Sequence, residues 1–175
     1  MKVFPIISIL ILMSFFAPAQ NEKTQNGHSI KVTFLGLSYA YEQSIARQST
    51  VNFEFMIAAG FGSNFMIGDY WLIVPKMRVE PRYYYNYNRR NEKMKKTINN
   101  SAIYLSLSAD YQFGSGIGEN ASSIQTYSIV PKWGMKRTIG NHFIYEFAFG
   151  IGASTSEIER WKTTIGLDLK LGYAF

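Results

Sequence analysis

Residues 161–175, the last segment of the chain, alternate strictly between two kinds of side chain. Successive side chains of a β-strand point to opposite faces, so a strand built from this segment has two different faces. Lys162, Asp168 and Lys170 share one face with glycine, alanine and threonine. The other face is apolar and aromatic and consists of Trp161, Thr163, Ile165, Leu167, Leu169, Leu171, Tyr173 and Phe175. This pattern is typical of a membrane-spanning barrel strand, with lipid outside and a polar lumen inside.

The alternation recurs in six earlier segments, at residues 35–42, 51–62, 70–87, 101–113, 123–137 and 141–153. No charge falls on any of the apolar faces, as a bilayer-facing surface requires, because Arg or Lys at the bilayer midplane costs about 2–4 kcal/mol. A soluble lipocalin-like barrel also has one apolar face, but that face must fit inside a small lumen. Here the apolar faces are rich in Phe, Tyr and Trp, while the polar faces carry many Gly, Ala and Ser. The polar faces are therefore predicted to point inward.

Seven strands are clear from the alternation, whereas single-chain bacterial barrels have an even number. Residues 30–34 also alternate, but with a parity opposite to that of the segment from Leu35 onward. The change of parity fits either a bulge within one long strand or a separate eighth strand. We expect an all-β, antiparallel, up-and-down transmembrane β-barrel of eight strands, because an open sheet edge in lipid leaves backbone groups unpaired.

The N-terminus has the pattern of an export signal. Lys2 supplies a positive charge, residues 5–16 form a short apolar run, and Ala17-Pro18-Ala19 supplies small residues before a cleavage site. We therefore expect a signal peptide over 1–19, cleaved before Gln20, then a leader over 20–29 and a barrel over 30–175. The chain has no Cys, so disulfides and thiolate metal sites play no part in its stability.

Charged residues on the polar faces are predicted to line the lumen. The basic ones are Lys76, Arg78, Arg82, Lys132, Lys136, Lys162 and Lys170, and the acidic ones are Glu42, Glu54, Glu80, Asp110, Glu146 and Asp168. Because buried charges in proteins are paired, we expect them to pair across a narrow lumen and to plug it. The Arg78-x-Glu80-x-Arg82 stripe fits either a selectivity ring or ligand site, or structural packing of the lumen, which we favour.

Few residues have the chemistry of an active site. The only histidines are His28 and His142, and the sequence contains no G-x-S-x-G, H-E-x-x-H or calcium-loop motif. Glu157 and Glu159, in the segment 154–160, are expected to be solvated loop charges rather than a metal site. We therefore assign no catalytic, cofactor-binding or metal-binding residue and expect no cofactor.

Several segments resemble the small OmpA-like outer-membrane β-barrels of Gram-negative bacteria, in particular a family of short exported barrels. They are residues 79–86 (VEPRYYYN), 99–101 (NNS), 131–134 (PKWG), 140–143 (GNHF) and the C-terminal Leu171-x-Tyr173-x-Phe175. The resemblance implies an outer-membrane location and recognition of the C-terminal Phe175 by the barrel-assembly machinery. It implies no particular activity.

The leading hypothesis is a non-enzymatic outer-membrane barrel with a structural or interaction role carried by its loops. The alternatives are a lipid-modifying outer-membrane enzyme, a narrow channel, and a soluble lipocalin-like carrier. The net charge of +6 is spread over strands, which favours outer-membrane lipids rather than nucleic acid as the partner. Counting passes back from a periplasmic Phe175 places the basic connector 88–100 in the periplasm and the 154–160 loop outside.

Overall fold

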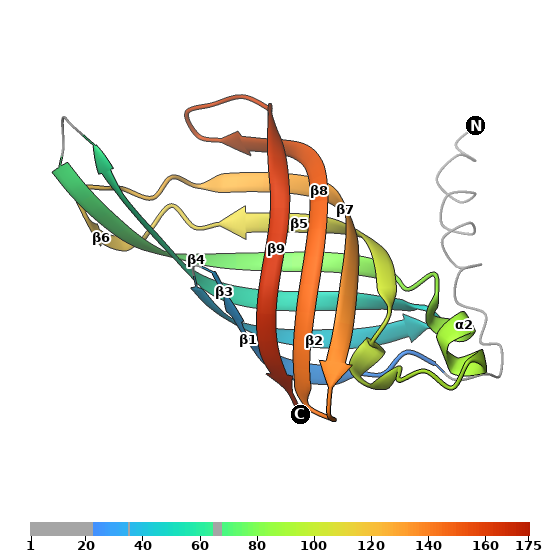
Figure 1. Ribbon diagram of the computed structural model, residues 1–175. Coiled ribbons are helices and arrows are strands. Elements are labelled where there is room, and N and C mark those ends of the chain that lie inside the picture. Colours follow the sequence, from blue (N-terminus) through green and yellow to red (C-terminus); the bar gives the residue numbers. More distant parts are fainter. Residues whose placement is uncertain (1–22, 35, 65–67) are drawn as a thin grey trace, which may run out of the picture.

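The computed structural model describes residues 23–34, 36–64 and 68–175, and in this part of the chain it is an antiparallel β-barrel (Figure 1). The predicted signal peptide, residues 1–19, lies outside the described residues. The barrel strands are β1 (Gly27–Thr33), β2 (Gly36–Ala46), β3 (Ser49–Asn64), β4 (Gly68–Tyr83), β5 (Ile103–Gln112), β7 (Thr126–Ile139), β8 (Phe143–Ser156) and β9 (Lys162–Ala174). The remaining elements are the helix α2 (Tyr87–Glu92), the 3₁₀ turn η2 (Ile98–Asn100) and the short strand β6 (Ile117–Glu119).

The eight barrel strands form one closed, up-and-down sheet. Each pairs antiparallel with its neighbour along the chain, β5 with β7 included, and β1 pairs with β9 from Ser29–Ala174 to Thr33–Lys170. The change of parity near residue 34 is therefore a turn between two strands and not a bulge, and the eighth strand is β1. The additional strand β6 pairs with residues 71–73, near the beginning of β4.

The two faces of each strand lie as the alternation predicts. On β9, Leu169 is 51% exposed on the outside of the barrel, whereas its neighbour Lys170 is only 4% exposed inside it. Space inside is limited: a Cβ added to Gly166 would lie 2.8 Å from Cε of Lys132. Glycine and other small residues on the inner face thus leave room for the long charged side chains.

The strand predicted over 70–87 ends earlier than expected, at Tyr83. Tyr87 belongs to the apolar face of the segment 70–87, so the alternation predicts it on the outer surface. This prediction was wrong, because Tyr87 is buried. Tyr84 and Tyr87 are buried and pack with Ala102 and Tyr104, and the amide of Tyr84 donates a hydrogen bond to the carbonyl of Gln48. The chain turns here because the turn buries the rings of Tyr84 and Tyr87 in this cluster. A continued strand would leave the ring of Tyr87 on the outer surface.

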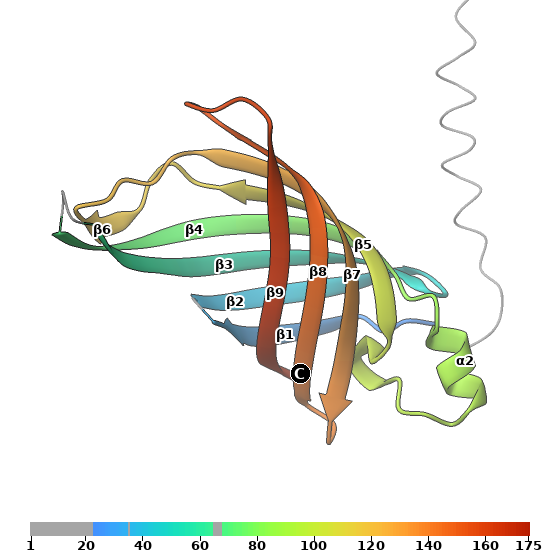
Figure 2. The ribbon, with the colours of Figure 1, turned by 45° about the horizontal axis from the view of Figure 1, so that its top comes forward.

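The connector over residues 84–102 lies at the same end of the barrel as the C-terminus, and the loop over 157–161 lies at the other (Figures 1 and 2). We call these the α2 end and the hairpin end. The loop over 113–125, which contains β6, also lies at the hairpin end. Among the described residues, no helix is long and apolar enough to cross a membrane.

Candidate functional site: the charged lumen

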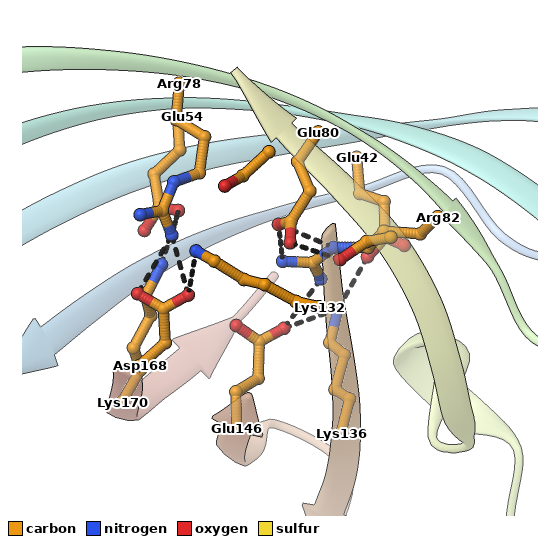
Figure 3. Close-up of polar contacts among 12 residues, drawn as sticks. Glu42, Glu54, Arg78, Glu80, Arg82, Lys132, Lys136, Glu146, Asp168 and Lys170 are labelled. Atoms are coloured by element: carbon orange, nitrogen blue, oxygen red, sulfur yellow. Dashed lines mark hydrogen bonds and ion pairs between the residues drawn. The ribbon is translucent and has the colours of Figure 1, made fainter. Parts of the chain in front are cut away.

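The lumen contains two groups of paired charges, most of which are labelled in Figure 3. Their residues come from all eight barrel strands. Alternation along each strand places these side chains on the inner face, and closure of the barrel brings distant strands within reach of one another. The α2-end cluster consists of Lys31, Glu42, Glu80, Arg82, Lys136 and Glu146. The hairpin-end cluster consists of Glu54, Arg78, Asp110, Lys132, Asp168 and Lys170.

Glu146 is the centre of the α2-end cluster. Its carboxylate accepts a hydrogen bond of 2.8 Å from Nζ of Lys31 and one of 2.9 Å from Nη1 of Arg82. Nζ of Lys136 lies 3.9 Å away and bonds Glu42 at 2.7 Å. Both oxygens of Glu146 are therefore used. Among the described residues, Lys31 makes an ion pair with this carboxylate alone, while Arg82 also pairs with Glu80 and Lys136 with Glu42.

Arg82 links the charges to the aromatic residues at the α2 end. Its guanidinium donates to Glu80 through Nε and Nη2, at 2.9 and 2.6 Å, and lies 4.6 Å from the ring centre of Tyr104. The hydroxyl of Tyr84 donates to Glu42 at 2.6 Å. Burial and the Glu42 carboxylate together raise the pKa of Tyr84 well above its usual value, so this hydroxyl remains a donor. Ion pairs and rings together close this end of the lumen.

Asp168 has the corresponding role in the hairpin-end cluster. It accepts hydrogen bonds from Nη1 of Arg78, at 2.9 and 3.0 Å, and from Nζ of Lys132 at 2.7 Å. Nε of Arg78 also bonds Asp110. Arg78 therefore bridges two carboxylates that come from β5 and β9.

Glu54 completes this cluster through a separate pair. Lys170 donates to its Oε2 at 2.6 Å, and the hydroxyl of Ser38 donates to its Oε1 at the same distance. Both residues of the ion pair are buried. The pair joins β3 to β9 across the inside of the barrel, over the inner faces of β1 and β2.

A cavity of about 460 Å³ lies beside the hairpin-end cluster. The apolar part of its wall includes Met56 and Val130. The charged part consists of the basic side chains of Lys76, Arg78, Lys132 and Lys170 and the acidic side chains of Asp110 and Asp168. The two ends of the lumen therefore differ: the α2 end is closed by paired charges and aromatic rings, while the hairpin end holds a cavity lined by four basic and two acidic side chains.

The sequence identified most of these lumen residues but not all of them. Lys162 was predicted inside the lumen, but it is exposed at the start of β9 and pairs with Glu159 of the preceding loop. The sequence prediction omitted Lys31, which is almost fully buried. Its alternation with Ile30 and Val32 was a usable signal, but β1 was not recognised as a separate strand. The Arg78-x-Glu80-x-Arg82 stripe lies inside the barrel and divides between the two clusters.

The two histidines lie on either side of the C-terminal end of β9. Nδ1 of His28 is 2.7 Å from the hydroxyl of Tyr39, and Nδ1 of His142 is 2.9 Å from the carbonyl oxygen of Ala174. Both rings stack on neighbouring aromatic side chains, His28 on Tyr41 and His142 on Tyr173. These contacts give the imidazoles a packing role. In the part of the chain that the structure describes, no group of three acidic or histidine side chains could hold a metal ion.

Comparison with protein-family models, curated proteins and solved structures gave no match. The strand order defines the class: the chain is an eight-stranded antiparallel β-barrel with one additional strand. Its candidate site is the charged lumen.

We predict that Glu146→Gln destabilises the barrel by about 3–5 kcal/mol, because it leaves Lys31 buried without a counter-ion and removes one of the two carboxylates that pair with Arg82. The matched control is Glu159→Gln, which breaks an exposed pair with Lys162 and should cost less than about 1 kcal/mol. Denaturant unfolding of the refolded protein, followed by tryptophan fluorescence, measures both. Equal losses in the two variants would mean that the lumen pairs do not hold the strands together.

Proposed function

We propose that the protein is a non-enzymatic outer-membrane β-barrel whose lumen charges are structural and whose loops carry its interactions. The observation that carries this proposal is the inverted distribution of side chains. Large apolar residues such as Phe55, Leu107 and Leu169 are exposed on the outside, while Lys31, Glu80 and Arg82 are buried inside. In water such an exterior would aggregate, whereas in a bilayer it contacts the hydrocarbon chains of the lipids.

The positions of the aromatic residues support this proposal. Tyr83, Tyr85, Phe143, Tyr173 and Phe175 are exposed toward the α2 end, and Trp71, Tyr127 and Trp161 are exposed toward the hairpin end. Aromatic side chains collect at the two membrane–water interfaces of transmembrane barrels. Two such groups, separated by exposed aliphatic residues and phenylalanines such as Phe55 and Phe149, fit a bilayer between them.

The same distribution disfavours two of the alternatives. A lipocalin-like carrier needs an apolar interior, but Glu54, Arg78 and Lys170 are paired inside this barrel. An open channel needs a continuous aqueous path, but the α2 end is crossed by the pairs of Glu146 and covered by Tyr84. A structural, plugged lumen is the better fit.

The two ends of the barrel differ in charge, which bears on the partners. The connector at the α2 end carries Arg89, Arg90, Lys93, Lys95 and Lys96 against Glu92 alone, while Glu157 and Glu159 lie at the hairpin end. Exposed basic residues attract anionic lipid headgroups. We propose outer-membrane lipids as partners, together with the barrel-assembly machinery acting on the C-terminal Phe175.

Cell fractionation of the native host tests the location directly. We expect the chain in the outer-membrane fraction, with an N-terminus at Gln20 after removal of the signal peptide. An inner-membrane lipid marker and a soluble periplasmic enzyme serve as controls. Recovery of the mature chain with the soluble marker would contradict the proposal.

We predict that Leu169→Arg impairs folding into phospholipid vesicles, because Leu169 lies outside, near the middle of β9. A basic side chain at the bilayer midplane costs about 2–4 kcal/mol. The folded fraction is measured by its altered gel migration without heating, and Leu169→Met is the matched control. Unchanged folding of Leu169→Arg would show that this face does not contact lipid.

The orientation of the barrel gives a further prediction. If the α2 end faces the periplasm, Glu157→Cys reacts with a membrane-impermeant maleimide on intact cells and Lys93→Cys does not. Both positions are exposed, and the chain has no native cysteine to interfere. Lysed cells, in which both variants should react, provide the control. The reverse labelling would place the basic connector at the cell surface.

A further inference from the structure

The wall of the barrel has a gap between β9 and β3, on the hairpin-end side of the turn that joins β1 to β2. We call this gap the notch. Pairing of β1 with β9 stops at Thr33–Lys170, yet β9 extends back to Lys162. Pairing of β2 with β3 stops at Gly36–Ala58, yet β3 continues to Asn64. Figures 1 and 2 show β3 and β4 running on past the ends of β1 and β2, while β8 and β9 run on in another direction. The short hairpin therefore leaves a gap between β9 and β3.

The edges of this notch lack strand partners within the described residues. Residues 162–169 of β9 pair only with β8, and residues 59–64 of β3 pair only with β4. An open strand edge leaves unpaired backbone groups, which is costly when the edge faces lipid. A polar group that enters the notch from the bilayer would find hydrogen-bonding partners there.

The cavity at the hairpin end lies directly behind the notch. Its wall includes Thr33 and Phe34 at the β1–β2 turn, Ala58 and Ala59 on β3, and residues 164–170 of β9. Residues from both edges thus line the same cavity, so it opens sideways through the barrel wall. The volume of about 460 Å³ lies within the range of small-molecule sites.

Lys76 gives this cavity an unbalanced positive charge. The described lumen contains seven basic side chains, the lysines at 31, 76, 132, 136 and 170 with Arg78 and Arg82, against six acidic ones, at 42, 54, 80, 110, 146 and 168. Of these seven basic side chains, Lys76 is the one that makes no hydrogen bond or ion pair with the described residues. Asp110 lines the same cavity, but it is already bonded to Arg78. An anion beside Lys76 would restore the charge balance.

The rim of the notch is apolar on its outer side. Phe34 is 86% exposed and Ile165 70%, and Leu167 and Ile57 are also exposed. These residues continue the apolar band of the outer surface on both sides of the gap. A hydrocarbon chain that lies across the rim therefore remains in apolar surroundings while a polar group at its end reaches the lumen.

We propose that the notch is a lateral binding site for a single-chain amphiphile with an anionic headgroup, a carboxylate or a phosphate. The headgroup binds Lys76 beside Arg78 and Lys132, and the acyl chain leaves through the gap between β9 and β3, across Phe34 and Ile165. This site rests on the proposed membrane location, because it draws its ligand from the bilayer. It assigns the hairpin-end half of the lumen to ligand binding and leaves the α2-end cluster as the plug.

Native mass spectrometry of the refolded mature chain in detergent tests this site. The probes are palmitate, palmitoyl lysophosphatidic acid, and neutral monopalmitoylglycerol, with acetate and inorganic phosphate as competitors that lack a chain. We expect one-to-one adducts with at least one of the two anionic lipids, no adduct with the neutral one, and no competition from the chainless anions. Which of the two anionic lipids binds identifies the headgroup.

Lys76→Met should weaken binding about tenfold, the effect of losing one charge-assisted hydrogen bond. Lys162→Met is the matched control: it removes a lysine from the same end of the barrel but outside the cavity, and binding should be unchanged. Lys76 makes no ion pair with the described residues, so its replacement leaves no buried carboxylate without a partner. Lys76→Met should therefore fold normally. Ala58→Phe, which fills the cavity, should also abolish the adduct.

Equal adducts with neutral and anionic lipids, or unchanged affinity in Lys76→Met, would overturn the site. Folding into vesicles, measured by gel migration on the same preparations, reports the membrane proposal separately. A barrel that inserts but binds no anionic lipid contradicts only the notch, whereas a chain that fails to insert contradicts the proposed function itself.

Discussion

Five residue pairs between β1 and β9, from Ser29–Ala174 to Thr33–Lys170, join the two ends of the sheet and turn it into a barrel. The closure brings Lys31 of β1 to Glu146 of β8 and Lys170 of β9 to Glu54 of β3. In an open sheet these charges would lie on a flat polar face in contact with water. In the closed barrel they are buried, and a buried charge is tolerated only with a well-placed partner. The lumen network therefore depends on the shortest barrel strand.

The short length of β1 also has a cost. It supplies the contacts that close the sheet near the α2 end, but it stops before β9 and β3 do, so the wall is incomplete toward the hairpin end. The two halves of the lumen reflect this difference. Near the α2 end, where the wall is complete, Glu146 and Arg82 are paired with each other and buried. Beside the gap there is a cavity, and Lys76 in its wall makes no ion pair with the described residues.

Much of this architecture could be predicted from the sequence, because a side-chain period of two is a local property. The alternation identified seven strands and placed Leu169 outside and Lys170 inside, as the structure has them. It failed where a non-local contact decided the outcome. The pattern through Tyr87 continued as a strand would, but Tyr84 and Tyr87 turn inward to pack with Tyr104. Lys162 follows the inward parity of β9 and yet is exposed at the first residue of the strand, where the loop carboxylate of Glu159 pairs with it.

The sequence by itself determined the fold class, the two faces of the strands and the kinds of charge that the interior would hold. It could do so because each of these depends on the direction of a side chain relative to its immediate neighbours. Only the tertiary structure decided which charges pair, where the wall is open and which lysine remains without a counter-ion. These features depend on the register between strands and on their relative lengths. Glu146 binds Lys31, which lies 115 residues away in the chain, and no local pattern of the sequence predicts a contact between residues so far apart.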